Sequence, residues 1–569
     1  MRVETKEHCG RRRVVRAGHF LSPQEQYGVA TSPSQFGSRE LASTFEKTRV
    51  AKKPTEPSHA RGDSNVQKFY DNAVVFITGG SGFIGKQLIE KLLRSCNIMK
   101  IYVLLRVKKN KTIEERLKAL LDDPVYDDLH KEQPNFVHKI VPIEGDIESL
   151  KLGIDDESWK TLAEEVNVII HAAATVNFNE TVKKATLTNV RGAREVLKLA
   201  EICKQLKSLV HLSTAYSHAT ISRVGKEVEE DFYESPISPD ILIELAETMD
   251  NEVLTAMITP LTKDWPNTYT LTKAVAEELI RVQGIGLPVC IVRPACVIAS
   301  YREPCPGWVD VRNVYGPSGL VLGGGLGVLH TLLVKNSVNV DFVPVDIVNN
   351  IIIVAAYETQ SKYVSGKCQI NIYVATKSRT PAPIGVLSSA LRNEAMNIVT
   401  SKAIWYCFAI ATPYKFIYRI LTWILHYIPA VMVDGICRLF GQKPRLLQVY
   451  KKVSSLSSAL QYFLNNDWVF QDTNTLSMSN SLSQTDKLIY NCDLASVNAR
   501  ELYYIWAYGI GRFIVKDDAK LRKYAQRKQT VLKYVHYLIL PLYLYALLKI
   551  ALMVVKIILH VTKIDSYIF

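Results

Sequence analysis

Tyr269 and Lys273 lie four positions apart in PNTYTLTKAVAEELI, and their types and spacing could support acid catalysis. The segment has helical periodicity, so both side chains project from one face of a helix. Reduction of a carbonyl needs a proton donor at the nascent alkoxide. A phenol of intrinsic pKa about 10 does this poorly near neutral pH unless a cation stabilises its anion. We predict that Lys273 supplies this cation and lowers the pKa of Tyr269.

The YxxxK spacing occurs often by chance, so its position in the chain matters. It lies between a predicted strand ending in HLSTAY and another ending in VRP. At the end of the first strand, Ser213 or Thr214 could offer a hydroxyl to a substrate carbonyl; Thr214 is preferred because it is one step further past the buried strand. Asn189, in LTNVRGA, is a candidate for holding a water or the helix backbone in a proton relay. A capped or kinked helix residue explains Asn189 equally well.

A second set of residues could bind a dinucleotide. The strand VVFIT runs directly into GGSGFIG and a predicted helix. This TGxxGxxG spacing is a variant of the loop whose backbone approaches a pyrophosphate at a helix N-terminus, although a simple tight turn is the alternative. Strand, loop, helix and next strand fall within about thirty residues, which supports the dinucleotide site. The predicted cofactor-binding residues are Thr78, Gly79, Gly82, Phe83, Ile84, Gly85, Arg106, Asp146 and Ile147.

The end of the second predicted strand indicates which cofactor is bound. An NAD site would place an acidic residue there for the ribose 2′-hydroxyl, whereas Arg106, with Lys108 and Lys109 close by, suits a 2′-phosphate. NADPH is therefore favoured over NADH, and a solvated charge after a strand is the alternative. Asp146, in EGDI, could accept a hydrogen bond from the adenine amino group, although an ordinary strand-end aspartate is nearly as good an interpretation.

The elements that must position these residues follow one pattern between residues 72 and 365, where short apolar strands alternate with amphipathic helices. This alternation predicts an α/β catalytic domain of the Rossmann type, with a doubly wound parallel sheet. Residues 1–71 are rich in Ser, Pro, Glu, Lys and Arg and are predicted to form a disordered basic arm. Residues 366–529 lose the alternation and are predicted to form a mainly helical C-terminal domain.

Two apolar segments bear on membrane attachment. Residues 530–562 are almost continuously apolar, broken by three lysines and one proline, and are predicted to attach the chain to a membrane by crossing it or lying in its interface. Residues 404–433 are interrupted by two basic residues and two prolines, which favours a surface-lying or core-packed helix. The basic run KLRKYAQRK before the tail predicts that the catalytic domain is cytosolic.

Composition excludes several classes of function. The 569 residues include 69 Lys and Arg against 55 Asp and Glu, a net charge of +14 that fits a nucleotide or an anionic membrane. Because nucleic-acid-binding motifs are missing from the sequence, nucleic acid is not an expected partner. The ten cysteines lie singly, with no CxxC pair and no His cluster at metal-ligand spacing, so a reducing compartment and no metal site are expected.

In combination, these motifs resemble the extended short-chain dehydrogenases, and among them the fatty acyl-CoA reductases. The resemblance covers residues 72 to 360 and includes FITGGSGFIGK, YVLLR, HAAATVNF, VHLSTAYSH, PNTYTLTKA, IVRPACV, GPSGL and VPVDIV. It implies that Tyr269 and Lys273 are catalytic and that long-chain acyl-CoA is reduced to a primary fatty alcohol with two NADPH and release of CoA. It also implies membrane lipid as a partner, with the endoplasmic reticulum favoured over the peroxisome.

Three positions depart from the family pattern, namely Asn177, Leu326 and His330. At the last two, the family has cations near a possible CoA-facing loop, so acyl-CoA affinity or activity could be reduced. One alternative is a membrane-bound NAD(P)-dependent sterol or steroid dehydrogenase, against which Arg106 and the long C-terminal domain count. Another is a catalytically weak cofactor-binding membrane scaffold, against which the intact Tyr269 counts. The stoichiometry of cofactor turnover would separate these interpretations. A fatty acyl-CoA reductase would use two NADPH per thioester, a sterol dehydrogenase one nucleotide per sterol, and a scaffold none.

Overall fold

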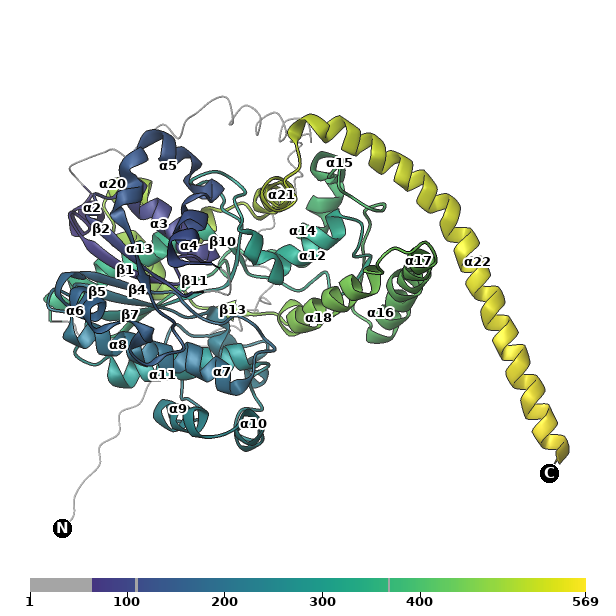
Figure 1. Ribbon diagram of the computed structural model, residues 1–569, viewed down its shortest axis with the longest axis horizontal. Coiled ribbons are helices and arrows are strands. Elements are labelled where there is room, and N and C mark those ends of the chain that lie inside the picture. The colour runs from purple at the N-terminus through teal and green to yellow at the C-terminus, as the bar shows by residue number, and fades with distance from the viewer. Residues whose placement is uncertain (1–63, 108–110, 367–368, 569) are drawn as a thin grey trace, which may run out of the picture. The chain divides into compact units, whose positions relative to one another are not determined.

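The protein is described by a computed structural model that covers residues 64–107, 111–366 and 369–568 (Figure 1). The expected basic arm lies outside this part up to residue 63, as do Lys108 and Lys109. The remainder of the expected arm contains helix α2 (Asn65–Phe69), capped by Ser64. Asp486 accepts hydrogen bonds from the Ser64 hydroxyl and from the Asn65 amide, the latter at 3.2 Å. Folded structure therefore begins before the expected boundary at residue 71.

Seven parallel strands form the central sheet, in the order β11-β7-β5-β4-β1-β2-β3. Strands β1, β2 and β3 extend to one side, and the strand order reverses between β1 and β4. This reversal is the switch point at which doubly wound sheets bind ligands, and it confirms the predicted Rossmann-type fold. The strands are β1 (Val74–Thr78), β2 (Lys100–Leu105), β3 (Ile140–Glu144), β4 (Val168–His171), β5 (Ser208–Leu212), β7 (Val289–Pro294) and β11 (Asn371–Ala375).

Helices cover both faces of this sheet (Figure 1). Helices α3 and α13 pack together on one face, where α13 contacts β5 and β7, while α8 and α11 pack together on the other. Every residue of β1 is buried, as parallel strands covered on both faces require. The helices of this region are α3 (Phe83–Ser95), α4 (Ile113–Leu121), α5 (Asp127–Glu132), α6 (Asp156–Glu165), α7 (Val182–Thr186), α8 (Gly192–Ile202), α9 (Pro239–Thr248), α10 (Asn251–Ile258), α11 (Thr268–Gln283), α12 (Pro317–Gly325) and α13 (Val345–Val364).

The C-terminal region is mainly helical, as predicted, but it is not separate from the sheet. The seventh strand, β11, lies beyond the expected boundary at residue 365 and completes the sheet beside β7. Three further pairs of short strands are parallel and lie outside the central sheet. In them, β6 (Glu227–Val228) pairs with β13 (Val469–Phe470), β8 (Cys296–Ile298) pairs with β10 (Phe342–Pro344), and β9 (Thr331–Leu333) pairs with β12 (Ile410–Thr412). The helices are α14 (Ile384–Asn393), α15 (Ala395–Ile398), α16 (Lys415–Thr422), α17 (Ile428–Leu439), α18 (Leu446–Leu464), α19 (Thr473–Ser481), α20 (Gln484–Ile489), α21 (Ala499–Gly509) and α22 (Arg522–Ile568).

Two helices in the described part of the chain are long and apolar enough to cross a membrane. They are Lys415–Leu439, where 22% of the most apolar 18-residue stretch is buried, and Arg522–Ile558, where none of that stretch is buried. The first includes α16, α17 and a π-helical turn (Trp423–Tyr427) between them. It lies on the surface, one of the two arrangements expected of residues 404–433, but the helix begins only at Lys415. The second is the first part of α22, which begins before the expected tail at residue 530.

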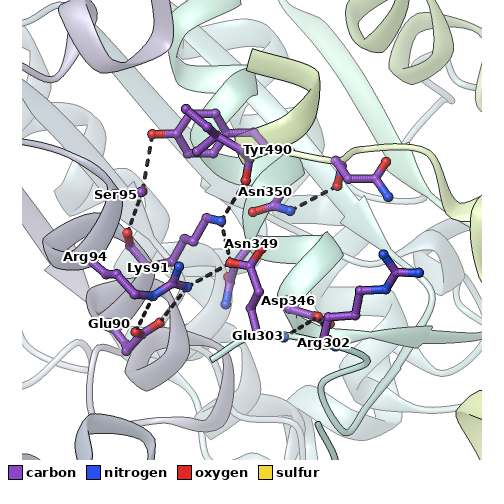
Figure 2. Close-up of polar contacts among 12 residues, drawn as sticks. Glu90, Lys91, Arg94, Ser95, Arg302, Glu303, Asp346, Asn349, Asn350 and Tyr490 are labelled. Carbon is purple, nitrogen blue, oxygen red and sulfur yellow. Dashed lines mark hydrogen bonds and ion pairs between the residues drawn. The ribbon is translucent and has the colours of Figure 1, made fainter. Parts of the chain in front are cut away.

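A buried polar cluster joins helix α3 to the C-terminal region (Figure 2). On α3, Lys91 and Arg94 bind the carboxylate of Glu303 at 2.5 Å and 2.8 Å. Lys91 also donates to the carbonyl oxygen of Ile489 at 2.7 Å. The loop that carries Glu303 is held by Asp346, which accepts its backbone amide at 3.0 Å. The helix that follows the glycine loop is therefore positioned by residues some 200 and 400 places later in the sequence.

We expect Glu303→Gln to destabilise the protein by about 3 kcal/mol, because it leaves the buried Lys91 ammonium without a carboxylate. Burial raises the pKa of Glu303, but Lys91 and Arg94 lower it from 4.5 to about 2. The stabilisation is therefore complete above pH 4.5 and is lost as the pH falls towards 2. Thermal unfolding measured across this range would show a smaller acid-induced loss in the variant.

The matched control is Glu165→Gln, which removes the partner of Lys100 from a more exposed ion pair. Such pairs contribute less than about 1 kcal/mol, so its unfolding midpoint should change little. Equal midpoints for Glu303→Gln and the wild-type chain would contradict a stabilising role for the cluster.

Candidate active site

The glycine loop lies at the switch point between β1 and β4. Gly79 has φ +77°, and a Cβ there would lie 2.7 Å from the carbonyl carbon of Ala172, so only glycine is accommodated. A Cβ on Gly85 would collide with the carbonyl oxygen of Gly79. Helix α3 starts directly after Gly82, so the amides of its first turn are directed at the edge of the sheet where a ligand can approach.

The other predicted loop residues have different surroundings. Thr78 is fully buried, and its hydroxyl is 2.7 Å from Nδ1 of His171 and accepts the amide of Ala173 at 3.2 Å. The Thr78 side chain therefore joins β1 to the end of β4, and the assignment of Thr78 to the phosphate loop stays a prediction. Phe83 stacks on Trp308 with ring centroids 5.3 Å apart.

Cations surround the glycine loop. Arg312 donates to the carbonyl oxygen of Ser81 at 2.7 Å, and Arg116 donates to the Ser81 hydroxyl at 3.3 Å and to the carbonyl oxygen of Arg106. Burial lowers the pKa of Arg116, and repulsion from Arg312 and Arg106 lowers it further, so the three guanidinium groups lie close together. Within residues 64–107, 111–366 and 369–568, Arg116 and Arg312 have no carboxylate partner.

A cavity of about 270 Å³ opens beside this cluster. It is lined by Ser81, Lys86, Lys111, Arg116, Ala119, Leu120 and Arg312. Free amides, a hydroxyl and unpaired guanidinium groups are the donors that phosphate groups require, so the site fits a dinucleotide. Arg116 and Arg312 were not found from the sequence. Arg116 could have been found by following the basic residues past the second strand, but Arg312 is brought here only by the fold.

The two predicted residues after β3 lie close to the cluster. Asp146 is 3.5 Å from the guanidinium of Arg106 and accepts the amide of Glu148 at 3.1 Å. Ile147 packs against Gly192 at the start of α8. The structure therefore brings Arg106 and Asp146 together at the carboxyl edge of the sheet, as the dinucleotide interpretation expects.

Tyr269 and Lys273 lie in the first turns of α11, on one face. Tyr269 is half-buried, and its hydroxyl forms a hydrogen bond with the Thr214 side chain. Burial raises the pKa of Tyr269 to about 12, although the hydrogen bond with Thr214 acts to lower this pKa. Lys273 donates to the carbonyl oxygen of Leu212 at 2.7 Å, and burial lowers its pKa to about 8. The expected lowering of the tyrosine pKa by Lys273 is therefore wrong for this arrangement, because burial dominates.

The two candidate hydroxyl groups are distinguished by their partners. Ser213 donates to the buried carboxylate of Glu277, whereas Thr214 interacts with Tyr269. This arrangement favours Thr214 as the residue that binds a substrate oxygen. Asn189 lies in a π-helical turn (Leu187–Arg191), accepts the amide of Thr175 at 2.9 Å and donates to the Thr272 hydroxyl at 2.9 Å. It thereby fastens the loop after β4 to the helix that carries Lys273.

Glu277 is a further site residue that sequence reasoning missed. It lies one helical turn after Lys273 and is 1% exposed. Burial raises its pKa, but Arg293, which binds it at 2.6 Å, and His218, at 3.2 Å, keep it well below its ordinary value. Its charge in turn raises the pKa of Lys273. The signal in the sequence was an acidic residue on the apolar face of AVAEELI.

An aromatic wall connects Tyr269 to the C-terminal region. Phe178 lies 5.8 Å from Tyr269 and 5.4 Å from Phe463, between ring centroids. Phe463 lies near the end of α18, and its ring is 5.1 Å from Tyr216. An apolar substrate next to Tyr269 would therefore contact α18, a segment nearly 200 residues away in the sequence.

The departures at Leu326 and His330 do not face an open surface. Leu326 packs against a cluster of Val328, Ala430 and Tyr450. His330 is 5% exposed and stacks on Phe408 at 4.4 Å. Both side chains contact the Lys415–Leu439 helix, and the expectation that these departures reduce acyl-CoA affinity stays a prediction.

Known proteins resemble this chain over most of its length. Residues 77–352 and 425–517 match two domain families, each described as male sterility protein. Fatty acyl-CoA reductase wat of Drosophila melanogaster is 35% identical over 503 residues, which cover 87% of this chain and 96% of the relative. Fatty acyl-CoA reductase 1 of Homo sapiens is 32% identical over 491 residues, covering 83% and 90%.

Solved structures share the fold. The terminal R domain of the myxalamid PKS-NRPS pathway has a TM-score of 0.53 at 20% identity, covering 77% of this chain and 90% of that one. The reductase domain of a nonribosomal peptide synthetase from Mycobacterium tuberculosis has a TM-score of 0.51 at 18% identity, covering 80% and 96%. These structures show the fold, while the relatives and the family match above support an oxidoreductase with a nicotinamide cofactor. The chain belongs to the fatty acyl-CoA reductase family.

Proposed function

We propose that this protein reduces long-chain acyl-CoA to a primary fatty alcohol, using two NADPH and releasing CoA. The observation that carries the proposal is the position of Tyr269, which has Thr214 beside its hydroxyl and an apolar wall of Phe178 and Phe463 beside its ring. The hydroxyl groups of Tyr269 and Thr214 can bind a carbonyl oxygen, and the wall of Phe178 and Phe463 can accommodate an acyl chain. The relatives' printed names supply the acyl-CoA substrate class.

The chain's own residues account for proton delivery. The hydroxyl groups of Thr214 and Tyr269 bind the thioester oxygen, and the raised pKa of Tyr269 keeps its phenol protonated as a donor. A bound NADPH supplies the hydride. Tyr269 donates a proton as the oxygen gains charge, and the Lys273 ammonium, one helical turn further along the same face of α11, returns a proton to the phenolate. Loss of CoA then leaves an aldehyde, which the same groups protonate in a second reduction.

The cation cluster supports NADPH over NADH. Arg106 and Arg116 lie together beyond the end of β2, where the ribose 2′-position of a bound dinucleotide is expected. Arg312 lies at the same turn, where it donates to the carbonyl oxygen of Ser81. A 2′-phosphate would relieve the mutual repulsion of these guanidinium groups, whereas a bare hydroxyl would leave Arg116 and Arg312 without an anionic partner.

We also propose that α22 attaches the protein to a membrane with the sheet domain on the cytosolic side. The apolar part of α22 has no buried share, and exposed side chains such as Leu538, Leu542 and Leu548 project from it. The cations Lys523, Arg527 and Lys528 precede this part. Such cations remain on the cytosolic side under the positive-inside rule.

Full-length protein in detergent micelles should convert palmitoyl-CoA and longer acyl-CoAs to alcohols at two NADPH per thioester. Tyr269→Phe should lower kcat by about 100-fold or more, because the proton donor is lost. Alcohol, aldehyde and NADPH would be measured together. The control Tyr363→Phe, at a surface tyrosine bonded to Gly286, should retain full activity. Oxidation of a sterol at one nucleotide each, without thioester turnover, would contradict the proposal and support a sterol dehydrogenase.

Arg116→Gln should raise the KM for NADPH by about 10-fold or more and leave the KM for NADH unchanged, since a hydrogen bond to a charged group contributes about 1.5–3 kcal/mol. Steady-state kinetics with both nucleotides would measure this. Arg281→Gln, at an exposed arginine on α11 paired with Glu278, is the control. Equal effects on NADPH and NADH would show that Arg116 does not read the 2′-phosphate.

Glu277→Gln should move the alkaline limb of the pH–kcat profile to lower pH. The Glu277 carboxylate raises the pKa of Lys273, so its loss lowers that pKa below about 8 and the ammonium is deprotonated earlier. Glu278→Gln, one position along the same helix, should leave the limb in place.

Because Glu277→Gln leaves the buried Arg293 without its carboxylate, the variant could unfold. The double variant Glu277→Gln/Arg293→Met removes both charges and provides a second test. Its thermal unfolding would be checked first. An unshifted alkaline limb in either folded variant would contradict electrostatic coupling between Glu277 and Lys273.

A further inference from the structure

The Lys415–Leu439 helix has its apolar side chains facing away from the protein. Among the most exposed are Phe416 (74%), Trp423 (61%) and Leu439 (86%). A surface helix of a water-soluble domain normally faces its polar side outward and its apolar side towards the core. This helix does the reverse, and an exposed apolar surface of this kind marks an interaction site.

A single narrow stripe fastens this helix to the folded body. Its buried residues recur every four positions and are Thr422, His426, Ala430 and Asp434. The stripe makes contacts along its length: His426 accepts the amide of His330 at 2.9 Å, and Ala430 packs with Val328 and Tyr450. A helix attached to the body in this way cannot cross a bilayer, so its outward face can meet lipid only by lying along a membrane surface.

Helix α22 contacts this helix within the apolar part of α22. The Tyr543 hydroxyl donates to the carbonyl oxygen of Ile424 at 2.8 Å. That carbonyl lies in the π-helical turn, where its partner five positions later would be Pro429, which has no N–H. Where α22 lies along the bilayer, this contact brings the Lys415–Leu439 helix to the same lipid surface.

The charged side chains on and after this helix are almost all positive. From residue 413 to 465 the sequence has seven Lys and Arg residues and a single acidic residue, Asp434. Asp434 is 8% exposed and accepts the backbone amides of Arg445 and Leu446 at 3.1 and 3.0 Å, next to the start of α18. The exposed charges, Lys415 and Arg419 among them, are therefore positive and complement anionic lipid headgroups.

We propose that the Lys415–Leu439 helix lies in the headgroup region of an anionic phospholipid leaflet, parallel to its surface and with Phe416 and Trp423 immersed. The inference rests on the membrane attachment by α22 proposed above and needs no catalytic activity. Helix α18 contacts α17 near its start and carries Phe463 near its end, so it leads from this surface to the wall beside Tyr269 (Figure 1). The substrate's acyl chain would then enter from the leaflet along α18.

Trp423 is a natural probe of this arrangement. Full-length protein would be reconstituted into vesicles of phosphatidylcholine and phosphatidylserine that carry bromine either near the headgroups or deep in the acyl chains. The emission of Trp423 is obtained as the difference between the wild-type chain and Trp423→Phe. We expect bromine to quench this emission, more strongly from the shallow position, and the quenching to fall when phosphatidylserine is omitted.

A second experiment places a negative charge on the exposed face of the Lys415–Leu439 helix and compares it with the same charge elsewhere on the protein. Phe416→Glu should reduce the quenching of Trp423, whereas Ile285→Glu, at a residue of the sheet domain that is 76% exposed, should not. Flotation of the vesicles shows independently whether the protein is membrane-bound. Unquenched Trp423 in protein that floats would overturn the proposal while leaving attachment by α22 intact. It would indicate that a second copy of the chain or water covers the helix.

Discussion

The buried carboxylate of Glu277 holds together the elements on which the candidate site depends. It receives two hydrogen bonds from Arg293 on β7, and others from Ser217 and His218 in the turn after β5. Without it, a guanidinium with 1% exposure would be left unpaired, at a cost of several kcal/mol. The same negative charge offsets part of the burial that lowers the pKa of Lys273. The Glu277 carboxylate therefore both holds the fold together and influences the protonation of Lys273 in the candidate site.

Much of the fold and part of the site could be predicted from the sequence because the relevant signals are local. The strand, the glycine turn and helix α3 are consecutive, and Gly79 has the positive φ that its spacing implies. Tyr269 and Lys273 share a face because one helix carries both. Asn189 was identified as a kinked helix residue or a relay residue, and it lies in a π-helical turn bonded to Thr175 and Thr272.

The remaining features depend on contacts between distant segments, which a single sequence does not specify. Arg312 reaches the glycine loop from 231 residues away, and Phe463 reaches Tyr269 through Phe178. The direction of the Tyr269 pKa shift was predicted wrongly because neighbours in sequence indicate a cation but do not reveal burial. The boundary at residue 365 was misplaced because β11 follows a long helix, where the alternation of strands and helices is hardest to follow.

The hydrogen bond between Ser64 and Asp486 spans 422 positions, and that between Lys91 and Ile489 spans 398. Helices α2 and α3 are therefore both held by a segment that leaves the ribosome late. During synthesis, α2 and α3 emerge long before their partners, so the dinucleotide-binding half cannot reach its final packing while the chain is still growing. Such long-range closure slows folding and prolongs the exposure of apolar strands. Only about thirty residues separate Ile489 from the start of α22, so completion of the soluble domain and emergence of the apolar helix are nearly simultaneous events.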